Sequence, residues 1–261
     1  MQFSELLKSV VPGPGACSLQ VPDDWTQGRS LFGGLQVVLA IRAMRTLVPA
    51  GVPLRTVQTS FIAPVPPGLV SVQAKVLRTG KSATQIEARI VDGDETLCLV
   101  IGIFGQARSS TTERAPAQSV VTSEKPILMP YIAGIIPAFT QHFEARWLKG
   151  GLPFTGVDDA CAVVEIGMRG EDRASEDHVV AIADFIPPIA LSMLKKPSPG
   201  SSMTWMLEFV RERFDDLSAQ GWRVDAEMQA AQDGYISQSV MIWGPGGEPV
   251  ALSRQSMVVF G

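Results

Sequence analysis

Three kinds of polar side chain stand beside apolar segments in the second half of this chain. Asp184 follows the apolar run 179–183, and Gln255 lies within an apolar strand-like segment near the C-terminus. Two hydroxyls, Ser202 and Thr204, begin another strand-like segment. If Asp184 opens a helix, it is a usable carboxylate beside backbone N–H donors, which is a combination that can support chemistry.

Each of these residues also has a structural explanation. Asp is favoured at a helix N-cap, so Asp184 could simply begin an apolar helix expected at 185–195. Gln255 shares a strand face with apolar residues, the expected inward face, where a buried amide must find hydrogen-bond partners. Ser202 or Thr204 could merely satisfy a turn. The residues are therefore considered together, because none is decisive alone.

Other chemistries lack their usual patterns. His142 and His178 show no paired spacing, so we expect no metal site and no cofactor. No Gly-x-Ser-x-Gly turn is present to expose a nucleophilic serine. The segment 80–82, Gly-Lys-Ser, imitates a phosphate-binding loop but joins two strand-like runs, so a hairpin turn explains it better.

Composition excludes several classes of partner. The chain of 261 residues has 22 Lys and Arg against 26 Asp and Glu, and its positive residues are scattered, so we expect no nucleic-acid partner. It has no uninterrupted apolar run of about 18 residues and no signal-like start, so we expect a cytoplasmic protein with no membrane span. Cys17, Cys98 and Cys161 show no CxxC spacing and are expected to be small buried residues.

The two halves of the chain repeat one order of elements. An apolar helix expected at 33–48 precedes strand-like runs, and the helix expected at 185–195 precedes a second series. A helix that is apolar nearly all round must be wrapped by other elements. When the halves are overlaid, Ile101 falls on Gln255, so the second half gains an amide. The expected strands lie at 57–63, 70–78, 84–91 and 96–104, then at 140–147, 160–168, 202–210, 222–231, 234–243 and 249–260.

A polar segment separates the halves. Residues 107–125 are rich in Ser, Thr, Pro and charge, a composition that buries little and is typical of a linker. We therefore expect a first unit at 1–107, a linker at 108–127 and a second unit at 128–261.

The chain resembles the double hot-dog acyl-CoA thioesterases and is similar to bacterial thioesterase II. The resemblance covers almost the whole chain and depends on the order of several motifs. They are Gly28–Gly34, Ser60–Gly68, Val76–Ser82, Arg146-Trp147, Ala183–Pro188 and the final strand with Gln255.

The resemblance implies an α+β fold with two long helices, each wrapped by a curved antiparallel sheet. It also implies that Asp184, a hydroxyl from Ser202 or Thr204, and Gln255 activate a water that hydrolyses an acyl-CoA thioester without a covalent intermediate. Backbone N–H groups near a helix start would hold the oxyanion, and the groove between helix and sheet would take the acyl chain. Hot-dog sheet edges commonly pair, so the resemblance implies a homo-oligomer.

Two other functions remain open at this stage. A non-catalytic acyl-CoA-binding or scaffold protein could keep the same fold, since the family's usual Thr is replaced by Ser if Ser202 is the hydroxyl. A hot-dog hydratase would pair an Asp with a His at the helix start, but both histidines precede the expected second helix.

Overall fold

The computed structural model describes residues 1–123 and 125–260 and divides into two compact units. The first comprises residues 1–115 and 132–142, and the second comprises 116–131 and 143–261. Residues 132–142, which the sequence analysis assigned to the second half, thus belong to the first unit. No described helix is long and apolar enough to cross a membrane.

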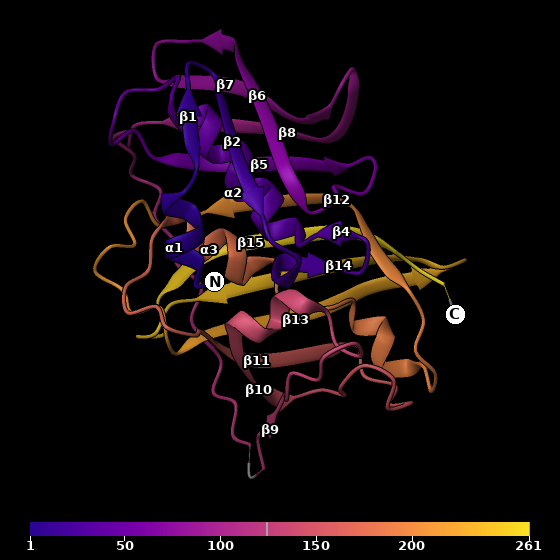
Figure 1. Cartoon of the computed structure of the whole chain (residues 1–261). Helices are drawn as coiled ribbons and strands as arrows, with labels where there is room; N and C mark the ends of the chain where they lie inside the picture. The colour runs from indigo at the N-terminus through magenta and orange to yellow at the C-terminus, as the bar shows by residue number, and fades with distance from the viewer. Residues whose placement is uncertain (124, 261) are drawn as a thin grey trace. The chain divides into compact units, whose positions relative to one another are not determined.

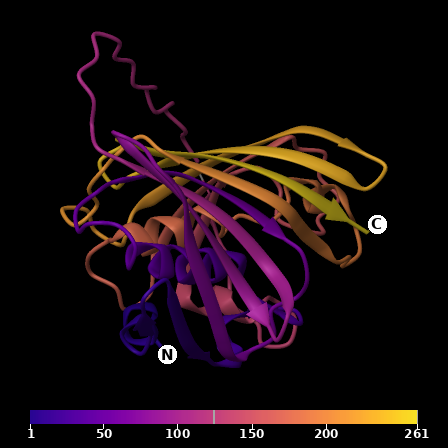
Figure 2. The same ribbon diagram turned by 90° about the horizontal axis from the view of Figure 1, so that it is seen from above.

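The first unit is a helix held against an antiparallel sheet. The sheet has the order β1-β2-β6-β7-β8-β5, and α2 lies against β2, β6, β7 and β8 (Figures 1 and 2). The elements are α1 (Phe3–Lys8), β1 (Val11–Gly13), β2 (Ala16–Val21), η1 (Asp23–Trp25), β3 (Thr26–Gln27), β4 (Ser30–Leu31), α2 (Gly33–Arg45), β5 (Leu54–Phe61), β6 (Gly68–Thr79), β7 (Ala83–Asp92), β8 (Glu95–Gly105) and η2 (Ala138–His142).

Helix α2 is buried over nearly its whole length. Its residues 33–41 are all buried, and its two arginines fall in the last turn, where positive charge is favourable. The expectation of a wrapped apolar helix is therefore met in this unit.

The second unit has a longer sheet and a shorter helix. Its strands follow the order β12-β15-β14-β13-β11-β10-β9, and α3 packs against β11. The elements are β9 (Ile127–Leu128), β10 (Phe143–Lys149), β11 (Cys161–Met168), α3 (Glu176–Ala183), η3 (Ile189–Met193), β12 (Gly200–Phe209), β13 (Trp222–Gln232), β14 (Tyr235–Trp243) and β15 (Pro249–Val259).

The sequence overlay of Ile101 on Gln255 matches a half-buried position of β8 with a buried position of β15. In β8, Ile101 pairs with Glu87 and Gln58, while its buried neighbour Val100 pairs with buried Ala88. A shift of one residue moves a side chain to the opposite face of a sheet. Gln255 is buried, so its counterparts in β8 are the inward positions beside Ile101, not Ile101 itself.

Aromatic stacking joins η2 to the start of the first unit. The His142 ring stacks on Trp25 with centroids 4.1 Å apart, and Phe139 stacks on Phe32 at 4.0 Å. The His142 Nε2 atom also lies 3.1 Å from the backbone oxygen of Asp24 and 3.3 Å from its carboxylate. Burial nevertheless holds the pKa of His142 below its ordinary value of 6.5.

Replacing His142 by Phe should reduce the acid sensitivity of the fold. Because burial lowers the folded-state pKa, the unfolded chain binds more protons below pH 6.5, and stability is lost as the pH falls from there towards the lowered pKa. Phe keeps a ring on Trp25 but cannot titrate. Urea denaturation at about pH 7.5 and about pH 5.5 should show a larger loss of unfolding free energy in the wild type than in His142→Phe. Equal losses would contradict this assignment.

Candidate active site

Asp184 lies at the end of a helix and not at the start of one. Helix α3 runs through the apolar residues 179–183, and Asp184 is its C-cap. The helix expected at 185–195 is therefore wrong. The expectation of helix-start N–H groups around this carboxylate is wrong with it.

Two prolines account for the difference. Pro187 and Pro188 lack a backbone N–H, and a residue that precedes proline disfavours the α conformation, so a helix cannot run through Ile186 and Pro187. The chain resumes as the short η3 after Pro188. At the other end, Ser175 has extended backbone and α3 has two acidic residues in its first turn, which suits a helix start.

A hydrogen bond joins Asp184 to Gln255. The Gln255 Nε2 atom donates to Asp184 Oδ1 at 2.6 Å, Gln255 is buried, and Asp184 is half-buried. Asp184 is the C-cap of α3, so N-capping does not explain this residue. A negative charge at a helix C-terminus is also unfavourable. The amide of Gln255 therefore orients the carboxylate of Asp184.

Gln255 lies in a buried row that crosses three strands. It pairs with Trp205 of β12 on one side and with Gln238 of β14 on the other. Paired residues of antiparallel strands point to the same face, and all three are buried. The Trp205 Nε1–H donates to Ser253 Oγ at 2.8 Å, which satisfies the indole in that row.

A β-bulge separates the two candidate hydroxyls. Ser202 pairs with buried Met257, whereas Thr204 pairs with Ser256, and the register shifts between them. Met257 shares a face with Gln255, and Ser256 has the other face. Ser202 therefore lies on the face of Gln255, half-buried, while Thr204 is exposed on the opposite face.

Gln238 is a polar residue of this face that the sequence analysis missed. It is fully buried, and its Oε1 accepts a hydrogen bond from the Ile189 N–H at 2.8 Å. The signal was present in the sequence, since Gln238 takes an inward position between Ile236 and Val240, as Gln255 does in its own strand.

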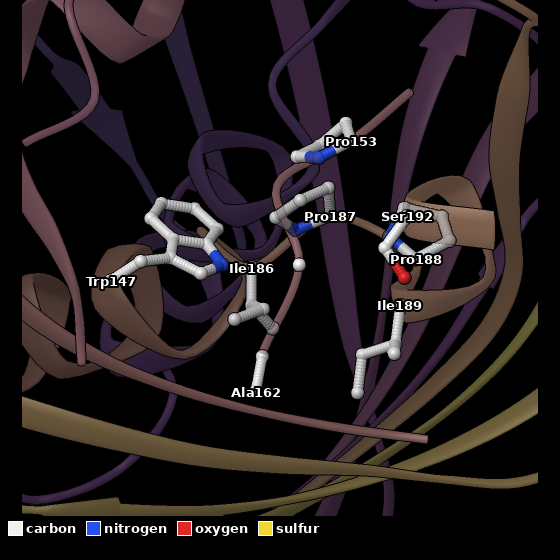
Figure 3. A pocket seen from close by; sticks show the side chains of 9 residues that line it. Trp147, Pro153, Ala162, Ile186, Pro187, Pro188, Ile189 and Ser192 are labelled. Carbon is white, nitrogen blue, oxygen red and sulfur yellow. The ribbon is translucent and has the colours of Figure 1, made fainter. Parts of the chain in front are cut away.

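An apolar pocket adjoins the segment that follows Asp184. In Figure 3, Ile186 and Pro187 lie between Trp147 on one side and Ile189 and Ser192 on the other. The remaining lining residues are Gly151, Pro153, Ala162 and Pro188. The pocket therefore lies within the second unit, next to the segment that links α3 to η3.

His178 belongs to a separate cluster at the start of α3. Its Nδ1 lies 2.8 Å from Ser175 Oγ, and its Nε2 lies 3.2 Å from Glu171 Oε2. These contacts tie the loop before α3 to the helix, and Asp184 lies at the other end. The Asp–His pair that a hydratase would need is not formed by Asp184 and His178. Within 1–123 and 125–260, no group of three or more His, Cys, Asp or Glu residues is arranged to hold a metal.

Two family profiles match most of the chain. The profile described as the acyl-CoA thioesterase N-terminal domain matches residues 21–105, and that of the acyl-CoA thioesterase C-terminal domain matches residues 112–259. No curated protein sequence matches significantly.

Solved structures share the fold at low sequence identity. A protein of unknown function with a hot-dog fold from Alicyclobacillus acidocaldarius has a TM-score of 0.87 at 17% identity, covering 100% of this chain and 99% of that one. A putative thioesterase II from Thermobifida fusca gives 0.79 at 14%, covering 100% and 98%. An acyl-CoA thioesterase II from Mycobacterium marinum gives 0.73 at 14%, covering 98% and 97%. The expected double hot-dog fold is confirmed.

The Cys17 thiol should not act as a nucleophile. Burial raises its pKa to about 11, even though Arg42 opposes the shift, and its Sγ donates to the Leu39 carbonyl at 3.3 Å. Because only the thiolate reacts, iodoacetamide at about pH 8 should leave Cys17 unmodified in the native protein and alkylate it after denaturation. Half-buried Cys161 serves as the comparison in the same peptide map. Rapid native alkylation of Cys17 would refute the prediction.

Proposed function

Because the chain belongs to the acyl-CoA thioesterase family, we propose that it hydrolyses acyl-CoA thioesters to a free acid and CoA, with Asp184 as general base. The observation that carries the proposal is the 2.6 Å hydrogen bond between Gln255 Nε2 and Asp184 Oδ1. This bond joins the carboxylate of Asp184, at the end of α3, to the buried amide of Gln255 in β15.

Asp184 and Gln255 would hold the attacking water. One hydrogen of the water would bond to a carboxylate oxygen of Asp184 and the other to Gln255 Oε1, because Gln255 Nε2 already donates to Asp184. The water's lone pair then faces the thioester carbon. Asp184 takes the proton as the carbon–oxygen bond forms, and general base catalysis of this kind contributes about 10² to 10⁴ in rate.

The leaving group needs little assistance. A thiol has a pKa of about 8.5, so the thiolate of CoA departs with the electron pair of the carbon–sulfur bond more readily than an alkoxide would. The proton held by Asp184 can pass to that thiolate. The carboxylate is then regenerated and no acyl-enzyme forms.

Ser202 would supply the hydroxyl, and the apolar pocket would take part of the acyl group. Support for Ser202 comes from the bulge in β12, which gives it the face of Gln255. Support for the pocket comes from its apolar lining beside the segment after Asp184.

Asp184→Asn should lower kcat for acyl-CoA hydrolysis by about 10²-fold or more, because the amide cannot accept the proton. The assay releases CoA from short, medium, long and aromatic acyl-CoAs and detects the thiol. Asp158→Asn is the control, because Asp158 is exposed. Undiminished turnover in folded Asp184→Asn would reject the proposal. Tight acyl-CoA binding by the wild type without turnover would favour a non-catalytic binding protein instead.

Ser202→Ala and Thr204→Ala should differ in effect. Loss of a hydroxyl that contacts the reacting atoms should lower kcat by about tenfold or more, so Ser202→Ala should be impaired. Thr204→Ala changes the opposite, exposed face and should keep wild-type kcat. Both variants should be compared at saturating substrate after their folds are checked by circular dichroism. The reverse pattern would assign the hydroxyl to Thr204.

A further inference from the structure

Gln238 has one satisfied end and one unsatisfied end. Its Oε1 accepts the Ile189 N–H at 2.8 Å, while its Nε2 is buried and has no hydrogen-bond partner in the part of the chain described. The residue as a whole is 0% exposed. Buried polar groups almost always have partners, so two orphaned N–H donors need an explanation.

The orientation of this amide is set by its partner. Amide oxygen and nitrogen are assigned from the hydrogen-bond network, and the backbone N–H of Ile189 can only donate. The oxygen of Gln238 must therefore face Ile189. The two N–H donors must point elsewhere, and rotating the amide by half a turn would set donor against donor.

These donors lie beside the proposed catalytic pair. Gln238 pairs directly with Gln255 across β14 and β15, and the Cβ atoms of such pairs are about 4.5–5.5 Å apart. Gln255 in turn holds Asp184. Ile189, which Gln238 binds, lines the apolar pocket (Figure 3).

Several backbone donors after Asp184 are already committed. The Phe185 N–H bonds to the Ile182 oxygen, and the Leu191 N–H bonds to the Pro188 oxygen. The Ile189 N–H is taken by Gln238 itself. Pro187 and Pro188 have none to offer. A side-chain donor at this place would not have to break any of these backbone bonds.

We propose that Gln238 Nε2 donates a hydrogen bond to the thioester carbonyl oxygen and stabilises it as an oxyanion. The inference rests on the proposed function. When the water oxygen bonds to the carbonyl carbon, the π electron pair moves onto the carbonyl oxygen and Asp184 takes the water's proton. The charged oxygen is the acceptor that the buried amide lacks. When the carbonyl re-forms, the carbon–sulfur bond breaks and the thiolate leaves.

Gln238→Met tests this role, because Met has similar length and no donor. We expect kcat to fall by about 10² with little change in KM, since the bond strengthens in the transition state. Gln36→Met is the matched control. Gln36 is also a buried glutamine with an unpartnered amide atom, but it lies in α2 of the first unit. Its replacement should leave kcat unchanged, whatever it does to stability.

Gln238→Glu keeps an acceptor for the Ile189 N–H and makes the donor to the oxyanion depend on pH. A buried carboxyl has a raised pKa and is protonated near neutrality, so it can accept from Ile189 and still donate one O–H. At higher pH it ionises and loses that donor. We expect kcat of this variant to fall on the alkaline side at a pH where the wild type stays active, with the fold verified at each pH.

The outcomes distinguish the oxyanion role of Gln238 from the proposed hydrolysis of acyl-CoA. If Asp184→Asn is inactive but folded Gln238→Met keeps wild-type kcat, the inference is overturned and the proposed function stands. If Gln238→Met does not fold, the pH profile of Gln238→Glu decides, and a profile identical to the wild type overturns the inference. A wild type that hydrolyses no acyl-CoA overturns both.

Discussion

Helix α3 cannot continue past the residues before Pro187 and Pro188, and the candidate site is built around this break. The chain leaves the helix at Asp184, where a carboxylate meets the negative end of the helix dipole. It resumes at Ile189, whose backbone N–H needs an acceptor because a helix start has no internal partner for it. Gln255 satisfies the carboxylate, and Gln238 satisfies the N–H. Two buried glutamines on adjacent strands thus bind the two ends of one break.

A second local irregularity separates the two candidate hydroxyls. Without the bulge in β12, Ser202 and Thr204 would share one face, because side chains alternate with a period of two. The extra residue turns Ser202 to the face of Trp205 and Gln255 and leaves Thr204 outside. Bulges commonly re-aim a side chain next to an active site. The helix break and the bulge both position polar groups that regular elements would have separated.

The strands of both units were largely predictable, because apolar and polar residues alternate along them. Gln255 was identifiable as a polar residue in an inward position. The position of α3 was not predictable in this way. Val179, Val180 and Ile182 are β-branched, and a short apolar run does not distinguish a buried strand from a helix. Pro187 and Pro188 fall in the first turn of the helix expected at 185–195, whereas they follow the end of α3. The bulge depends on pairing between distant strands, so the sequence left Ser202 and Thr204 as alternatives.

The first unit shows that this architecture does not require buried amides. Its inward pairs at the corresponding part of β7 and β8 are Ala88 with Val100 and Ile86 with Gly102. In the second unit, β14 and β15 carry Gln238 with Gln255. An unsatisfied buried donor costs about 1–3 kcal/mol, which an apolar pair would avoid. Departures from local rules of this kind concentrate at functional sites, so the asymmetry between the two sheets supports the proposed site more strongly than the repeat does.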